Sequence, residues 1–164
     1  MKGPEVIFME RKALVVGIGN RIRQDDSIGH YCVELLLKKL GPEKKELVDC
    51  LSVHQLDVVF CDLFAQYPLI IFLDADARDG KEPFLLEEVF PEPVSSPFTS
   101  HIGSIPDILS LTQRLYGVRP QAYITAVRGE NFEIGEEISR TAAHNACKAV
   151  ERVCRLISEF FPLH

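Results

Sequence analysis

An α/β fold is predicted for this chain of 164 residues, as a single-domain three-layer α/β/α sandwich with a mostly parallel twisted sheet of about five strands. Short, continuously apolar runs, typical of strands buried on both faces, alternate with stretches of helical apolar spacing. Such alternation indicates parallel strands joined by crossover helices on both faces of the sheet. The length suits one sizeable core. We expect an N-terminal extension over residues 1–12 and one domain over residues 13–161.

Three strands and two helices are predicted in the first half of the domain. Residues 13–17 form a short apolar run with two valines, which favours a buried strand. Ser27 then opens a helical pattern that Gly41 and Pro42 end. The other expected elements are a strand over residues 46–51, an amphipathic helix over residues 56–64 and a central strand over residues 69–73, the most uniformly apolar run of the chain.

Two further strands and two helices are predicted in the second half of the domain. Residues 91–97 hold three prolines and two serines, which indicates a loop. Ser139 is the expected N-cap of a long final helix whose inward stripe runs from Ala143 to Ile157. The other expected elements are a strand near the sheet edge over residues 85–90, a helix from Pro106 to Leu115 and a strand over residues 121–127.

Composition excludes several classes of protein. The net charge is −6 and no cluster of lysine and arginine is present, so we expect no nucleic-acid partner. The apolar piece over residues 6–9 is too short for a secretory or membrane-spanning segment, so we expect a cytoplasmic protein without a membrane partner. Five cysteines without a Cys-x-x-Cys pair predict buried free thiols.

Two adjacent carboxylates follow the first predicted strand. Gly17 and Gly19 allow a tight turn, and Asp25 and Asp26 then lie at a helix N-terminus, where the helix dipole favours ionised acids. Helix capping is an alternative role for this pair. Dinucleotide binding is disfavoured, because Ile22 stands where the phosphate-binding motif has its third glycine and two carboxylates repel a pyrophosphate.

A second carboxylate position follows the central strand, where Asp74 comes directly after the apolar run. Open α/β sheets collect their sites at the carboxyl ends of the strands, so Asp26 and Asp74 are expected to converge. His101 lies in a loop rich in glycine, serine and proline, where a side chain is free to serve a site, although a solvated loop histidine is the alternative. Two carboxylates and one imidazole are able to hold a divalent metal ion.

The ordered combination of these motifs resembles the nickel-iron hydrogenase maturation endopeptidases. The resemblance rests on Val15–Asn20 with Asp25, Asp26 and Gly29, on Leu73–Ala75, and on Ser100 and His101 with Asp107–Leu109 beyond them. It covers residues 13 to 158. The resemblance implies that Asp26, Asp74 and His101 form a catalytic, metal-binding triad, that Gly19 and Asn20 shape the turn, and that Asp25 has a supporting or capping role.

The resemblance also implies a metal-dependent endopeptidase that removes a C-terminal extension from the hydrogenase large-subunit precursor. Nickel, supplied by the precursor, is the implied metal and the feature recognised, and we expect the enzyme to be a monomer. One alternative is a nickel-sensing or chaperone-like protein that binds the same precursor without cutting it. Another is a peptidyl-tRNA hydrolase-like protein, suggested by a similar Gly-x-Gly-Asn turn but disfavoured by the acidic pair and the negative charge.

Overall fold

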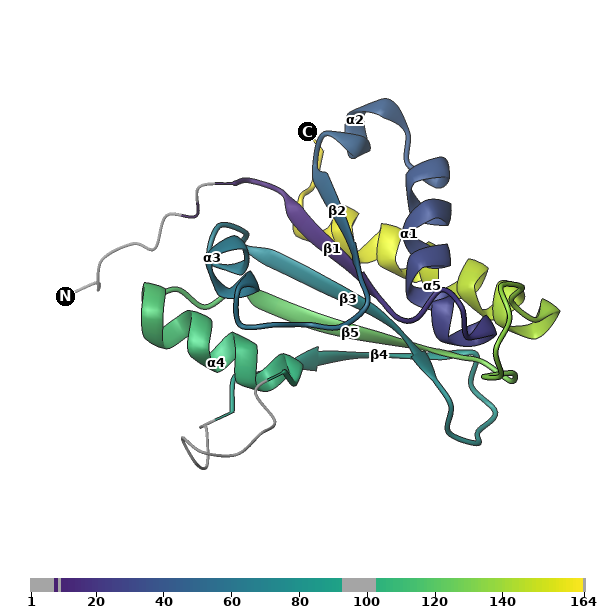
Figure 1. Cartoon of the computed structure of the whole chain (residues 1–164). Coiled ribbons are helices and arrows are strands. Elements are labelled where there is room, and N and C mark those ends of the chain that lie inside the picture. The colour runs from purple at the N-terminus through teal and green to yellow at the C-terminus, as the bar shows by residue number, and fades with distance from the viewer. Residues whose placement is uncertain (1–7, 9, 93–102, 164) are drawn as a thin grey trace.

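The structure is a computed structural model that describes residue 8, residues 10–92 and residues 103–163. One five-stranded sheet has the order β2-β1-β3-β5-β4, with helices on both faces (Figure 1). The predicted three-layer α/β class is therefore confirmed. The strands are β1 (Ala13–Ile18), β2 (Val48–Val53), β3 (Leu69–Asp76), β4 (Phe84–Val89) and β5 (Gln121–Arg128). The helices are η1 (Gln24–Ser27), α1 (Ile28–Lys39), α2 (Pro42–Lys45), α3 (Phe60–Phe64), α4 (Ile105–Tyr116) and α5 (Arg140–Phe160), of which η1 is a 3-10 helix.

The sheet separates two apolar cores, because successive side chains of a strand point to opposite faces. On one face, Val15 and Ile71 pack with the buried sides of α1 and α5. On the other, Val16 and Phe72 pack with residues of α3 and α4. The central strands β1 and β3 are apolar on both sides, which explains why their sequences show continuous apolar runs rather than alternation.

Several predicted boundaries differ from the structure. β3 continues through Asp76 because its last three residues pair with Ala126–Arg128 of β5, although the apolar run ends at Leu73. α3 begins only at Phe60, since the residues before it form turns closed by bonds such as Phe60 N–H to the Asp57 carbonyl, 3.1 Å. The expected edge strand is β4, which pairs antiparallel to β5.

Two glycines bring α1 unusually close to the sheet. A Cβ atom added to Gly29 would lie 2.5 Å from the Leu73 carbonyl oxygen of β3 and would overlap the Ile18 backbone of β1. A Cβ atom on Gly17 would stand 2.8 Å from the Gly29 carbonyl carbon. This close approach fixes the start of α1, and with it η1, at the carboxyl ends of β1 and β3.

All five cysteines are free, as predicted. Cys32 and Cys61 are buried, whereas the other three are half-buried, so burial of every thiol was wrong. The half-buried thiols are Cys50, Cys147 and Cys154. None of the helices in the described part of the chain combines the length and apolarity needed to span a membrane.

Candidate active site

Asp26 is held at the end of the turn that follows β1. Gly19 has a φ of 151°, and a side chain at this position would overlap the Asp26 carbonyl oxygen. The Asn20 N–H donates to Asp26 Oδ2 over 3.0 Å, and Asn20 Oδ1 accepts a bond of 3.1 Å from the Ile22 N–H. Gly19 and Asn20 therefore shape the turn that carries Asp26, and they fix one oxygen of its half-buried carboxylate.

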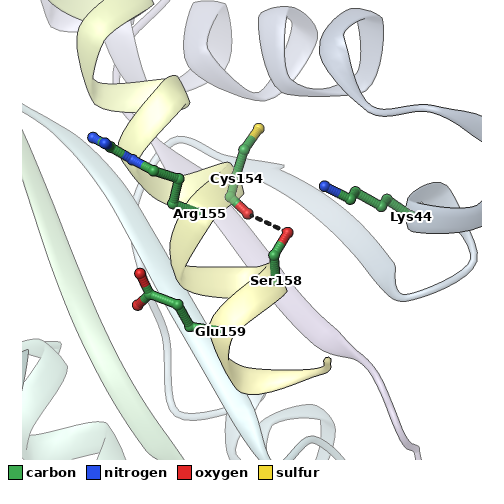
Figure 2. Close-up of a pocket in the computed structure, with 5 residues that line it drawn as sticks. All are labelled: Lys44, Cys154, Arg155, Ser158 and Glu159. Carbon is green, nitrogen blue, oxygen red and sulfur yellow. Dashed lines mark hydrogen bonds between the residues drawn. The ribbon is translucent and has the colours of Figure 1, made fainter. Parts of the chain in front are cut away.

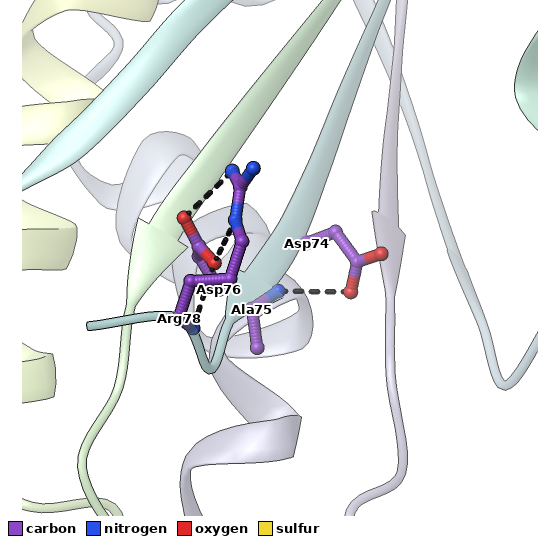
Figure 3. Close-up of polar contacts among 4 residues, drawn as sticks. All are labelled: Asp74, Ala75, Asp76 and Arg78. Atoms are coloured by element: carbon purple, nitrogen blue, oxygen red, sulfur yellow. Dashed lines mark hydrogen bonds and ion pairs between the residues drawn. The ribbon is translucent and has the colours of Figure 1, made fainter. Parts of the chain in front are cut away.

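Asp74 occupies the corresponding position on the neighbouring strand β3. The Ala75 N–H donates to Asp74 Oδ1 over 2.8 Å (Figure 3). Burial is the largest cause that raises the pKa of Asp74 to about 6; the negative charges of Asp26 and Asp76 act in the same direction, and the Ala75 hydrogen bond opposes them. The 3-10 helix η1, which carries Asp26, packs against β3, which carries Asp74, so the two predicted carboxylates converge at this end of the sheet.

Asp76, two residues beyond Asp74, is engaged differently. Arg78 Nε and Nη2 donate to its two carboxylate oxygens over 2.9 Å and 3.0 Å, and this pairing lowers the pKa of Asp76. Figure 3 shows the Asp74 carboxylate directed away from the Asp76–Arg78 pair. Among the described residues, Asp74 is thus the carboxylate of this strand end without a cationic partner, and Asp26 is the acid beside it.

Asp25 is fully buried and does not cap α1. Its carboxylate accepts from the Glu130 and Asn131 N–H groups over 2.7 Å and 3.0 Å, and from the Ser139 N–H and hydroxyl over 2.7 Å each. Burial raises the pKa of Asp25, but these four hydrogen bonds outweigh it and lower the pKa overall. Of the two roles expected, the supporting one is found: Asp25 anchors η1 to the segment that leads into α5.

His101, the third predicted site residue, lies outside the described residues. Within residues 10–92 and 103–163, no three His, Cys, Asp or Glu side chains are grouped so that they could hold a metal ion. The structure brings Asp26 and Asp74 together, and a complete triad with His101 stays a prediction.

His30 lies near the site but is not among the site residues that the sequence predicts. Its ring is buried, and Nε2 lies 2.7 Å from the Gly19 carbonyl oxygen, so it supports the turn that leads to Asp26. Nδ1 is buried and has no hydrogen-bond partner among the described residues. The helical spacing of four residues from Asp26 to His30 was the available signal. No local signal marks the long-range contacts of Asp25.

Two open cavities lie at opposite ends of the sheet. One of about 250 Å³ is lined by Asp76, Leu85, Ala126 and Arg128, and Ala126 is the direct neighbour of Asp74 in the β3–β5 register. The other, of about 400 Å³, lies between α2 and the end of α5 and is lined by Lys44, Cys154, Arg155, Ser158 and Glu159 (Figure 2). Neither cavity is lined by Asp26 or Asp74, and the first is lined by the Asp76–Arg78 pair, from which the Asp74 carboxylate is directed away.

These features define an α/β protein whose polar site lies at the carboxyl ends of parallel strands. Solved structures with this fold include a hydrogenase-maturating endopeptidase from Escherichia coli, with a TM-score of 0.70 and 23% identity over 90% of this chain and 93% of that one. A NiFe hydrogenase maturation protease from Thermococcus kodakarensis has a TM-score of 0.67 and 18% identity over 90% and 93% of the two chains.

A third similar structure is the solution structure of an endopeptidase from Escherichia coli, with a TM-score of 0.66 and 25% identity over 90% of this chain and 93% of that one. No protein-family model and no curated protein sequence matches the chain. The chain has the fold of the NiFe hydrogenase maturation proteases, so the resemblance seen in its sequence motifs is confirmed at the level of the fold.

Proposed function

We propose that this protein is an endopeptidase that removes a C-terminal extension from the nickel-loaded precursor of a NiFe hydrogenase large subunit. The observation that carries the proposal is the pair formed by Asp26 and Asp74, where burial, helped by the negative charge of Asp26, raises the pKa of Asp74 to about 6. Two neighbouring acids that have no cationic partner in the described part of the chain favour the arrival of a cation. The fold shared with maturation proteases supports the same conclusion.

Nickel reaches the proposed site as part of the precursor, which is the substrate. The two carboxylates supply hard oxygen ligands, and His101 would supply the imidazole nitrogen of the triad. A cation near the scissile bond polarises the peptide carbonyl or a water molecule. The residues of this chain orient that bond by holding the two carboxylates still: the Asn20 N–H fixes one oxygen of Asp26, and the Ala75 N–H fixes one oxygen of Asp74.

Asp74 is the better candidate for a general base. A pKa of about 6 lies nearer to neutral pH than that of an ordinary aspartate, so its carboxylate accepts a proton from an attacking water more readily. When the peptide bond breaks, the proton passes to the leaving amine and the carboxylate is restored. Asp26, with its Oδ2 fixed by Asn20, acts as an oxygen ligand only, whereas Asp74 is both a ligand and the base.

The test is the intact mass of a purified large-subunit precursor after incubation with this protein. We expect loss of a C-terminal peptide only when the precursor carries nickel, and no loss with Asp26→Asn or Asp74→Asn. Asp62→Asn, which changes an exposed acid on α3, is the matched control and should cut normally. An unchanged mass with a cognate nickel-loaded precursor, together with stable binding, would support the non-cutting binding protein instead.

A further inference from the structure

One peptide group links the buried His30 to the candidate site. His30 Nε2 lies 2.7 Å from the Gly19 carbonyl oxygen. The next N–H along the chain, that of Asn20, donates to Asp26 Oδ2 over 3.0 Å. A carbonyl oxygen only accepts hydrogen bonds, so Nε2 carries a hydrogen and donates it. The Gly19 carbonyl and the Asn20 N–H belong to the same planar peptide group, so His30 and Asp26 are bonded to opposite sides of one rigid unit.

The neighbouring peptide groups of this turn are held by other partners. The Gly19 N–H donates to the Val53 carbonyl over 3.1 Å, and the Asn20 carbonyl accepts from the Arg23 N–H over 3.2 Å. These bonds fix the peptide groups on either side but leave the rotation of the group between them free. Gly19, at a φ of 151°, restrains that rotation little through its own dihedral angles. Among the described residues, His30 is the partner that holds the Gly19 carbonyl, and with it the Asn20 N–H, in one direction.

The His30 ring is itself held in place. It has 5% of its surface exposed and belongs to the first turn of α1. The preceding residue, Gly29, packs so closely on the sheet that an added Cβ atom would lie 2.5 Å from the Leu73 carbonyl oxygen. The start of α1, and the ring with it, is thereby fixed against the strands whose ends carry the site.

The other ring nitrogen of His30 indicates that packing alone does not explain a histidine at this position. Nδ1 is buried and has no hydrogen-bond partner in the described part of the chain. A buried polar atom without a partner costs free energy, which an apolar side chain of similar size would avoid. The bond from Nε2 is the polar contact that accounts for the histidine, and it ends on the peptide group that holds Asp26.

We propose that His30 is a positioning residue: through the Gly19–Asn20 peptide group, it fixes the direction in which Asp26 presents its carboxylate. This inference rests on the proposed function, in which Asp26 is an oxygen ligand. A carboxylate is planar, so holding Oδ2 also directs the other oxygen. The bond accepted by the Gly19 carbonyl polarises the peptide group and strengthens the Asn20 N–H as a donor. Because its ring is buried, His30 acts through Asn20 rather than by contact with the substrate.

The test combines three substitutions at one position. His30→Leu removes the donor, His30→Gln places an amide N–H near the position of Nε2, and His30→Asn places one near that of Nδ1. With leucine or asparagine, kcat for cleavage of the nickel-loaded precursor should fall at least about tenfold, because Asp26 is present but no longer oriented. KM should change little, and glutamine should restore kcat. His144→Leu, at an exposed histidine of α5, is the control and should cut normally.

A second measurement needs no precursor. The amide proton of Asn20, which is bonded to a carboxylate, should resonate downfield in the proton–nitrogen NMR spectrum, and Asp26→Asn measures the contribution of that bond. His30→Leu should move the Asn20 resonance in the same direction as Asp26→Asn does. His30→Gln should leave it near its wild-type position.

The proposal is overturned if His30→Leu leaves both kcat and the Asn20 resonance unchanged, or if folded His30→Gln restores neither. If the leucine variant does not fold, the comparison of glutamine with asparagine decides in the same way. If wild-type protein cuts no precursor but the Asn20 resonance responds as expected, the protease function fails while the link from His30 to Asp26 stands. If wild-type protein cuts the precursor and all three variants cut equally fast, the protease function stands and the role of His30 fails.

Discussion

Asp25 and Ser139 lie 114 residues apart in the chain, yet the Asp25 carboxylate accepts hydrogen bonds from both the backbone N–H and the hydroxyl of Ser139. The same hydroxyl accepts from the Ala142 N–H over 3.1 Å and so caps α5. One buried carboxylate therefore ties the start of η1 to the start of the longest helix. The position of the neighbouring Asp26 depends on this connection.

Replacing Asp25 with asparagine should destabilise the protein by about 3 kcal/mol or more, because an amide cannot accept from all four donors and leaves buried N–H groups unpaired. Folding lowers the pKa of Asp25, so its ionised carboxylate stabilises the protein at pH values above the ordinary pKa of an aspartate. This stabilisation is lost as the pH falls through the pKa that Asp25 has in the folded protein. Urea unfolding at neutral and at acid pH should show the difference between variant and wild type shrinking in acid. An equal difference at both pH values would contradict this role of Asp25.

The two serine caps provide a matched comparison. Ser139 and Ser104 each accept from the N–H three residues later, but the Ser139 hydroxyl donates to buried Asp25, whereas the Ser104 hydroxyl donates to exposed Asp107. Ser104→Ala should cost about 1 kcal/mol, as a lost cap usually does, and Ser139→Ala should cost more. Chemical denaturation of both variants measures this, and equal losses would mean that the link to Asp25 adds nothing.

Asp74→Asn should stabilise the protein near neutral pH. Burial and neighbouring charge raise the pKa of Asp74 from 3.8 to about 6. Above pH 6 the folded protein therefore carries an unfavourable negative charge at Asp74, and the contribution of this group to stability improves as the pH falls from above 6 toward 4. Asparagine keeps an oxygen for the Ala75 N–H and carries no charge. We expect a gain of roughly 2 kcal/mol at pH 7.5 that disappears near pH 4. Urea midpoints at the two pH values decide, and a loss at pH 7.5 would contradict the prediction.

Asp26→Asn should lower the pKa of Asp74, because the charge of Asp26 is one of the causes that raise it. Burial is the largest cause, so the pKa should stay above that of an ordinary aspartate. Carbon-13 NMR titration of the aspartate carboxyl groups measures the pKa of Asp74 directly in the wild-type protein and in the Asp26→Asn variant. Asp62→Asn is the control, and if it moved the Asp74 pKa as far as Asp26→Asn does, the two candidate site acids would not be specifically coupled.

Gly29→Ala should prevent stable folding, because the added methyl group would stand 2.5 Å from the Leu73 carbonyl oxygen and meet the Ile18 backbone, and neither can move without breaking the sheet. Gly41→Ala is the matched control, since nothing lies within 4 Å of its added Cβ atom. Thermal unfolding should leave the Gly41 variant within about 1 kcal/mol of wild type. A Gly29 variant of wild-type stability would show that α1 does not need this close approach.

Much of the fold could be predicted from local patterns. The apolar runs at Ala13 and Leu69 and the cap at Ser139 each lie in the expected element. The end of β3 could not be predicted, because Asp74–Asp76 stay in the strand through pairing with β5 rather than through apolar side chains. The antiparallel direction of β4 likewise becomes visible only in its pairing with β5, not in its own residues.

Local spacing and residue type encode the alternation of strands and helices, the glycine turn and the two strand-end acids Asp26 and Asp74, so these features can be read without the structure. The role of Asp25 as an anchor and the raised pKa of Asp74 follow only from the three-dimensional structure. Each of these depends on groups brought together across the fold. Burial and charge at such contacts follow from three-dimensional packing, which no local pattern records.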